Sequence, residues 1–103
     1  SNQLADSDKD FRLLKEYTVE AERALYAIEQ ALKKDGAELL NKDEREIINN
    51  SISNLKQAIT SNDLKTIKDA TNQLESNSEF YVERRMNNSI KSLITGKDIN
   101  DII

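Results

Sequence analysis

The sequence predicts an all-α protein, an antiparallel three-helix bundle in which a long N-terminal helix overhangs the other two. One observation is the lack of chain breakers, because the 103 residues include two glycines and no proline. A second is the spacing of apolar residues, which recur every three or four positions over long stretches. This length suits one core, so residues 3–103 are expected to form a single subdomain. Residues 1–2 are interpreted as an expression remnant.

The first helix is expected over about residues 5–35. Asp6, Asp8 and Asp10 suit the positive N-terminal end of a helix dipole, and Gly36 after two lysines is typical of a glycine C-cap. About thirty residues at about 1.5 Å each make a rod of roughly 45 Å, more than a three-helix core of this size needs. We therefore predict that the N-terminal half of this helix overhangs. Its heptad seam consists of Leu4, Phe11, Leu14, Thr18, Ala21, Leu25, Ile28 and Leu32.

The second helix is expected over about residues 42–60. Asn41 and Glu44 have the spacing of a capping box, in which each side chain accepts a hydrogen bond from the backbone amide of the other. An apolar stripe along the helix predicts the face that packs on the core. The stripe consists of Ile48, Ile52, Leu55 and Ile59, widened by Ile47 and Ala58.

The third helix is expected over about residues 63–95, with Asn62 as its N-cap and Gly96 at its end. A bend or break is predicted near residues 76–79, because short polar side chains there compete for backbone hydrogen bonds. The tail after Gly96 is expected to fray. The predicted apolar seam is Leu64, Ile67, Leu74, Tyr81, Met86, Ile90, Leu93 and Ile94.

The composition argues against several classes of function. The 15 basic and 19 acidic residues are mixed and give a net charge of −4, which does not favour a nucleic-acid partner. No apolar run is long enough to span a bilayer and no signal-peptide pattern is present, so we expect no membrane partner and a cytoplasmic location. The lack of histidine and cysteine removes the commonest general base, metal ligand and thiol nucleophile. We therefore predict no enzymatic activity and no catalytic, metal or cofactor site in this chain.

Most of the chain, from about Ala5 onward, resembles a known family. The resemblance is to the C-terminal helical lid of the substrate-binding domain in the seventy-kilodalton heat-shock (DnaK-type) chaperones. It rests on "DSDKDFRLLKEYTVEAERALYAIEQALKKDGAELLNKDEREII" and on "EFYVERRMNNSIKSLITG". The second segment is similar to the HscA branch of the family, which serves iron–sulfur cluster assembly. The residues that carry this similarity are Glu79, Phe80, Arg84, Arg85, Met86, Ser89 and Gly96.

The resemblance implies a lid that closes over a client peptide and slows its release. The peptide would sit in a β-sandwich domain outside this sequence, and ATP and Mg would bind in a nucleotide-binding domain that is also outside it. For the HscA branch, the implied client is the iron–sulfur scaffold protein and the implied co-chaperone is a J-domain protein. Glu22 and Tyr26 would form a latch that binds loops of the β-sandwich. The general branch often has histidine at the position of Tyr26.

The overhanging half of the first helix is a second candidate site, formed by Phe11, Leu13, Leu14 and Tyr17. An apolar seam without a partner in its own chain invites association, so a concentration-dependent homodimer through this half is expected. For Phe11 and Leu14 ordinary core packing is the alternative interpretation. For Glu22 the alternative is a solvated surface carboxylate with weak i,i+4 pairing.

A structural three-helix coiled-coil module of the spectrin type is the alternative function. Such repeats usually keep a tryptophan in the core and have three helices of similar length. This chain has no tryptophan, and its expected middle helix is short. The lid interpretation is therefore favoured over the spectrin-like one.

Overall fold

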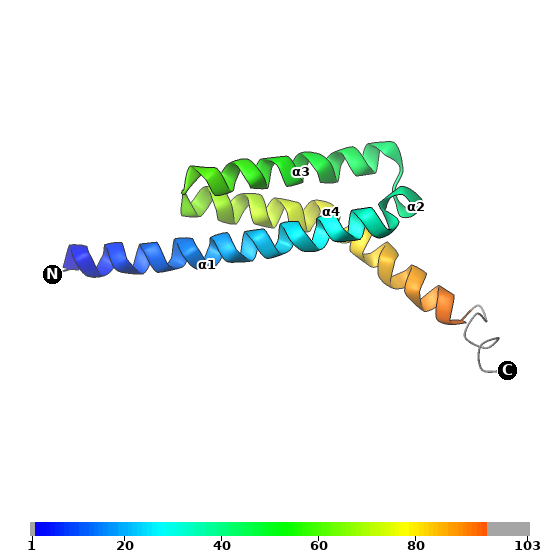
Figure 1. The fold of residues 1–103 in the computed structure, drawn as a ribbon, viewed down its shortest axis with the longest axis horizontal. Coiled ribbons are helices and arrows are strands. Elements are labelled where there is room, and N and C mark those ends of the chain that lie inside the picture. The colour runs from blue at the N-terminus through cyan, green and yellow to red at the C-terminus, as the bar shows by residue number, and fades with distance from the viewer. Residues whose placement is uncertain (1, 95–103) are drawn as a thin grey trace.

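The computed structural model describes residues 2–94, with side chains described from residue 9 onward. These residues form α1 (Asn2–Ala31), a π-helical turn (Leu32–Gly36), α2 (Ala37–Leu39), α3 (Lys42–Ser61) and α4 (Leu64–Ile94). The three long helices run up, down and up beside one another (Figure 1), and the described part of the chain contains no strand. The predicted all-α, antiparallel three-helix bundle is confirmed.

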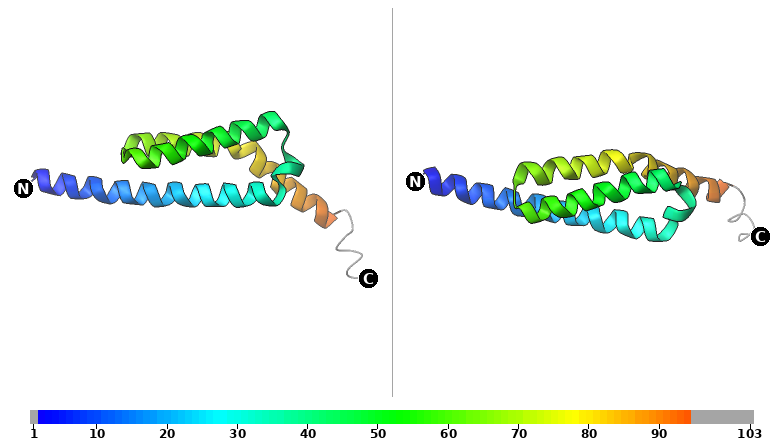
Figure 2. Two further views of the ribbon diagram at one scale, coloured as in Figure 1. Left: turned by 45° about the horizontal axis from the view of Figure 1, so that its top comes forward. Right: turned by 90° about the horizontal axis from the view of Figure 1, so that it is seen from above.

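The molecule is elongated because its three long helices differ in length. Helices α1 and α4 have 30 and 31 residues, whereas α3 has 20, and the overall extents are 69 × 31 × 17 Å. Helix α1 runs past the turn between α3 and α4 at its N-terminal end, which is the predicted overhang (Figures 1 and 2). The last turns of α4 leave the bundle at the opposite end. This second overhang was not predicted.

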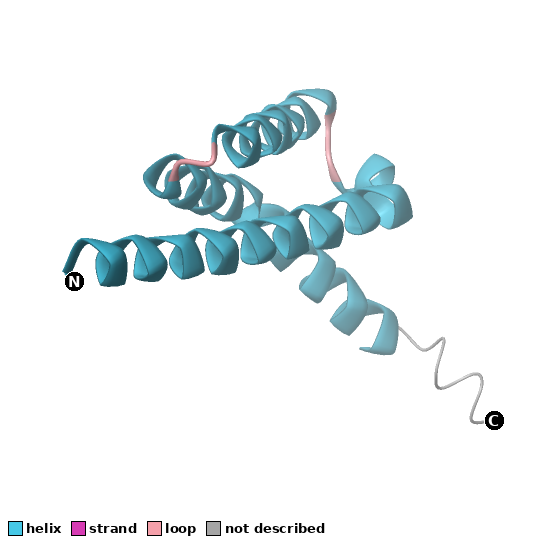
Figure 3. Ribbon diagram, turned by 60° about the vertical axis from the view of Figure 1, so that its left-hand side comes forward, coloured by secondary structure: helices cyan, strands magenta, loops and turns pink. Residues whose placement is uncertain are grey.

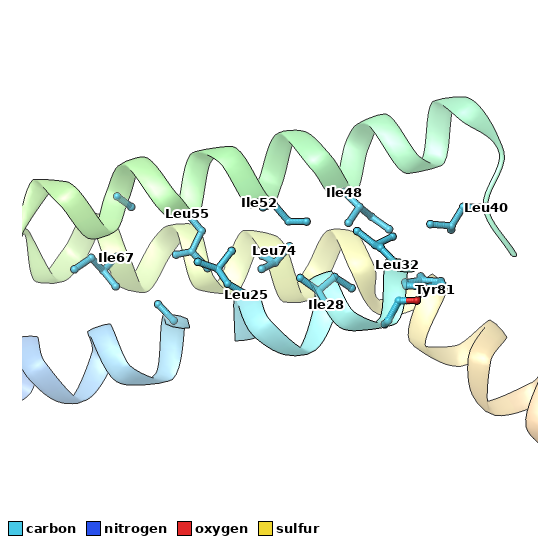
Figure 4. Packing of buried hydrophobic residues seen from close by; sticks show 13 residues of the cluster. Leu25, Ile28, Leu32, Leu40, Ile48, Ile52, Leu55, Ile67, Leu74 and Tyr81 are labelled. Atoms are coloured by element: carbon cyan, nitrogen blue, oxygen red, sulfur yellow. Dashed lines mark hydrogen bonds between the residues drawn. The ribbon is translucent and has the colours of Figure 1, made fainter. Parts of the chain in front are cut away.

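The core lies where α1, α3 and α4 run side by side (Figure 4). Ile48, Leu55 and Ile67 have no exposed surface, and Leu74 is 2% exposed. Burial of such side chains stabilises a fold by about 1.5–3 kcal/mol each relative to leaving them exposed. The predicted stripe of α3 is largely correct, since Ile48, Ile52, Leu55 and Ala58 are buried and Ile59 packs against the core. The prediction that Ile47 belongs to this buried stripe is wrong, because 49% of its surface is exposed.

Gly36 does not end the first helix. It has helical dihedrals (φ −58°, ψ −39°), and the chain continues through α2 before Leu40 becomes extended. The predicted C-cap is therefore wrong, and the helix begins at Asn2 rather than near residue 5. Close packing explains this glycine better, because a Cβ atom at Gly36 would lie 3.1 Å from Cδ2 of Leu32.

The two links between the long helices have different caps (Figure 3). The Asn41 capping box is confirmed, because Glu44 N donates to Asn41 Oδ1 over 2.8 Å and Asn41 N donates to Glu44 Oε1 over 3.0 Å. The N-cap predicted at Asn62 is wrong. Asn62 is left-handed (φ 56°) and ends α3, a conformation that asparagine tolerates better than most residues. The N-terminal capping interaction of α4 comes from Asp63, whose carboxylate accepts from Thr66 N over 3.0 Å.

Helix α4 is continuous through residues 76–79, so the predicted break is not present. The polar side chains there find partners that leave the helical ladder intact. Ser78 Oγ donates to the Leu74 carbonyl oxygen over 2.7 Å, and Asn77 Nδ2 donates to Ser51 Oγ of α3 over 2.8 Å. Back-bonding of this kind by serine tends to bend a helix. The ribbon of α4 turns away from the bundle close to Tyr81 (Figure 4).

The C-terminal part of the predicted α4 seam is not in the core. Ile67, Leu74 and Tyr81 are buried as expected, and Leu64 is half-buried. The last turns of α4 leave the bundle (Figure 1), and the remaining apolar residues of the seam are largely exposed. They are Met86, Ile90, Leu93 and Ile94, with exposed fractions of 60%, 51%, 62% and 70%. Gly96 and the tail after it lie outside the described residues.

Candidate functional site: the exposed face of the first helix

Helix α1 has a buried face and an exposed face. Ala21, Leu25 and Ile28 lie in the core with at most 7% of their surface exposed. Glu22 and Tyr26 alternate with these residues along the helix and are exposed, Tyr26 at 69%. A spacing of four places them next to each other on one side of the helix. The two predicted latch residues therefore lie together on an exposed face of α1.

Neither latch side chain is used inside the chain. Among the residues that the structure describes, Glu22 and Tyr26 make no hydrogen bond, ion pair or ring contact. A carboxylate and a phenol hydroxyl at this spacing present two acceptors and a donor to whatever lies opposite. Such a pair can bind backbone amides or a basic side chain, and it has no arrangement for catalysis.

Two more apolar side chains lie on the exposed side of α1, toward its N-terminal end. Phe11 is 63% exposed and Val19 is 39% exposed. Charged residues of both signs surround them, and they include Arg23, whose Nη1 lies 3.9 Å from Glu20 Oε1. The whole face is thus a line of apolar and aromatic side chains in a mixed charged border. We call Phe11, Val19, Glu22 and Tyr26 the outer face of α1.

The overhang is shorter than the sequence predicted. Leu14 and Tyr17 were placed in the free half, but both pack against the core cluster as partly buried residues. Tyr17 also has the Lys68 ammonium 5.9 Å from its ring centroid. Leu13 is half-buried, so Phe11 is the only one of the four predicted residues with a mostly free side chain. The homodimer expected through this half stays a prediction, with less apolar surface available than the sequence suggested.

A buried polar cluster holds the other end of α1 against α4. The Tyr81 hydroxyl lies 2.7 Å from the Ala31 carbonyl oxygen and also within hydrogen-bond reach of the Asp35 carboxylate, to which Arg85 Nε donates over 2.8 Å. Burial raises the pKa of Asp35, but hydrogen bonds from Arg85 and Tyr81 outweigh it and hold the pKa below its usual value. Burial and the nearby carboxylate raise the pKa of Tyr81. The phenol therefore stays protonated and acts as a donor.

A second ion pair closes the same end of the bundle from the side of α3. Arg84 binds Glu44 with both terminal nitrogens, over 2.7 and 2.6 Å, and Nη1 also donates to the Leu39 carbonyl oxygen over 2.8 Å. Two parallel hydrogen bonds fix the guanidinium against the carboxylate. Local sequence reasoning missed these pairs, because Arg84 and Arg85 lie 40 and 50 positions from their acidic partners. Together they tie α4 to the π-helical turn and to the start of α3 at this end of the bundle.

Acid is expected to weaken this end of the bundle. The hydrogen bonds from Arg84, with a smaller contribution from the Asn41 amide, lower the pKa of Glu44 from 4.5 to about 2. Because the folded-state value lies below the unfolded one, the charged carboxylate stabilises the fold above pH 4.5, and this contribution is lost as the pH falls toward 2. Glu44→Gln should therefore lower the urea midpoint at pH 7, and the difference from wild type should shrink between pH 4.5 and 2.

The matched control for this experiment is Glu46→Gln. Glu46 is exposed on the same helix and has no partner among the residues that the structure describes. The Glu46→Gln substitution should leave the urea midpoint nearly unchanged at every pH. A Glu44→Gln difference that stayed constant down to pH 2 would show that the ion pair contributes nothing through its charge.

Two other kinds of site are absent from the described part of the chain. No group of three or more His, Cys, Asp or Glu side chains among residues 9–94 is arranged to hold a metal ion. None of the described helices combines the length and the apolar character that crossing a membrane requires.

Comparison with known proteins gives a consistent set of similarities. A family model described as "Hsp70 protein" matches residues 1–87, which include the two residues interpreted as an expression remnant. A "Chaperone protein HscA homolog" from Acinetobacter baumannii is 40% identical over 99 residues, covering 96% of this chain and 16% of that protein. A protein of the same name from Tolumonas auensis is 37% identical over 102 residues, covering 99% of this chain and 17% of that protein.

A more distant relative shows how far the similarity extends. The "Chaperone protein HscA homolog" of Pseudomonas putida is 34% identical over 98 residues, covering 95% of this chain and 16% of that protein. The chain thus spans about a sixth of the length of these curated relatives. The similarity extends over nearly all of its own length, so it includes the outer face of α1 and the Arg84–Arg85 cluster.

Proposed function

Because this chain belongs to the Hsp70 protein family, we propose that it is the lid of a DnaK/HscA-type ATP-dependent chaperone. The lid closes over a peptide in the β-sandwich domain and slows the release of that peptide. One observation carries the proposal: the outer face of α1 is exposed, while another face of the same helix is buried in the bundle core. The family assignment removes the spectrin-like alternative.

The outer face is the part that docks. Its polar members, Glu22 and Tyr26, contact loops of the β-sandwich, and Phe11 and Val19 add apolar contact further toward the N-terminus. A lid must keep its position relative to the docking face. The hydrogen bonds of Tyr81 to the Ala31 carbonyl and to Asp35 hold the C-terminal end of α1 against α4. ATP binding in the nucleotide-binding domain favours the undocked lid, and hydrolysis favours the closed one.

The similarity to proteins named HscA homologues points to one branch of chaperone function. The client in this proposal is an iron–sulfur scaffold protein, and the co-chaperone is a J-domain protein. The client and the co-chaperone act through the β-sandwich and nucleotide-binding domains, and ATP and Mg bind in the nucleotide-binding domain. The chaperone acts in the cytoplasm. This chain itself has no catalytic role in the cycle, because it contributes position and stiffness rather than chemistry.

The test is the rate of peptide release from the full-length chaperone that carries this chain. Glu22→Ala and Tyr26→Ala should each speed release of a fluorescent client peptide from the ADP-bound state by roughly tenfold, the factor that about 1.4 kcal/mol of lost docking energy produces. Tyr26→Phe separates the roles of ring and hydroxyl, since it keeps the ring contact and removes the hydrogen bond.

Glu46→Ala serves as the matched control, because it removes an exposed glutamate from α3 rather than from the outer face. It should leave release unchanged. Release rates equal to wild type in both Glu22→Ala and Tyr26→Ala would contradict the docking role of the outer face.

A further inference from the structure

The overhanging end of α4 carries an apolar stripe that nothing in the described chain covers. Val82, Met86, Ile90 and Leu93 follow one another at steps of four, four and three, so they share one side of the helix. Their exposed fractions are 47%, 60%, 51% and 62%, and Ile94 beside them is 70% exposed. Lys91 is the only charged residue between Met86 and Ile94. This pattern is typical of a helix seam that pairs with a second helix.

A hollow between α1 and α4 continues the same stripe toward the bundle. It measures about 180 Å³, and Val82 belongs both to its wall and to the stripe. Alanine side chains of α1 form one wall, namely Ala24, Ala27 and Ala31. The wall from α4 is mixed, because it contains Leu74 and Tyr81 together with Glu75 and Arg85. The chain therefore has a protruding apolar end and, next to it along α4, a recess whose walls are partly apolar and which meets the stripe at Val82.

We infer that this surface binds a second copy of this chain, with the two α4 helices antiparallel. In that arrangement Met86 of each copy packs near Ile90 of the other, and Leu93 and Ile94 of each copy enter the recess beside Val82 of the other. One patch then serves both copies, as a two-fold symmetric interface requires. A parallel pairing would leave both recesses empty and would bring the two bundles against each other.

The available area is sufficient for a weak, reversible dimer. The exposed surface of the five side chains is roughly 500 Å² on one copy and roughly 1,000 Å² on two, the lower limit for a specific interface. The stripe lies at the end of the molecule opposite the N-terminus (Figure 1), so the dimer leaves the N-terminal part of the outer face of α1 uncovered. The inference does not depend on the proposed lid function.

Sedimentation equilibrium of the 103-residue chain between about 10 μM and 1 mM tests the inference. Wild type should show a monomer–dimer equilibrium. The double variant Met86→Ser/Ile90→Ser should weaken it at least about tenfold by removing apolar contact. Ala27→Glu should also weaken dimerisation, because it places a carboxylate in the recess that Leu93 and Ile94 of the other copy enter. Both changes are at exposed positions, and unchanged helicity by circular dichroism verifies the fold.

Phe11→Ser is the matched control, since it removes an exposed apolar side chain from the opposite end of the molecule. It should leave the equilibrium unchanged. The inference is overturned if the chain stays monomeric at 1 mM, if the dimer survives both interface changes, or if Phe11→Ser alone abolishes it. The last outcome would place the dimer on the overhang of α1.

Disulfide trapping tests the antiparallel direction. The chain has no cysteine, so single cysteines can be introduced without a background. A mixture of Val82→Cys and Leu93→Cys chains should form the mixed cross-link faster than either chain links to itself. Faster self-linking of each variant would contradict the antiparallel pairing.

Discussion

Replacing Tyr81 with alanine is expected to lower the free energy of unfolding by about 3–5 kcal/mol, the usual cost of deleting a buried aromatic ring. Tyr81 is the largest side chain with no exposed surface, and it lies where α4 turns away from the bundle (Figure 4). The change also removes the hydroxyl that contacts the Ala31 carbonyl and Asp35 Oδ1, while Arg85 still binds the other oxygen of Asp35. Domains of this size are stable by about 5–15 kcal/mol, so a large share of the total would be lost.

Urea unfolding followed by circular dichroism measures this effect at low protein concentration. Tyr81→Phe separates the ring from the hydroxyl, and it should cost about 1–3 kcal/mol for the lost hydrogen bond to a charged partner. Tyr26→Ala is the matched control, because it removes the same ring from a position that is 69% exposed. It should change stability by no more than about 0.5 kcal/mol. Equal losses for Tyr81→Ala and Tyr26→Ala would contradict the anchoring role of Tyr81.

Leu55→Ala should have the second-largest effect, a loss of about 2–5 kcal/mol. Leu55 has no exposed surface and points from α3 into the core, toward Leu25 of α1 (Figure 4). Its removal leaves a cavity at the point where all three long helices meet, and the surrounding side chains can fill only part of it.

The same substitution at Leu93 isolates the contribution of packing. Leu93 is 62% exposed in the overhang of α4, so Leu93→Ala should cost less than about 0.5 kcal/mol in the monomer. Helix propensity changes equally in both variants, and the difference between them reports tertiary contact. If Leu55→Ala were as mild as Leu93→Ala, the core could not be where the structure places it.

Much of the fold could be predicted from the sequence, because the signals of an α-helix lie in residues close together in the chain. The spacing of Ile48, Ile52 and Leu55 identified the buried face of α3, and Asn41 and Glu44 identified its start. These features depend on residues three or four positions apart, and such neighbours meet in any α-helix. The latch pair Glu22 and Tyr26 came from resemblance, and their spacing of four is enough to place them together on one face.

The wrong and missed predictions have different causes. Glycine often ends a helix and asparagine often begins one, so the sequence predicts a C-cap at Gly36 and an N-cap at Asn62. In the structure Gly36 is helical and packs closely against Leu32, and Asn62 adopts a left-handed conformation that ends α3. The ion pairs of Arg84 and Arg85 join residues 40 and 50 positions apart, and no local pattern signals such distant partners. Met86 and Ile90 have helical spacing, but spacing does not say whether a neighbouring helix reaches that far.

The sequence by itself determined that the chain is helical, where the middle helix starts, and which side of each helix is apolar. Only the tertiary structure decided how much of each apolar side is covered. Helix α3 has 20 residues, whereas α1 and α4 have 30 and 31, so the bundle ends before its two longer helices do. Coverage depends on how the helices align, and that alignment is set by contacts between residues far apart in the chain.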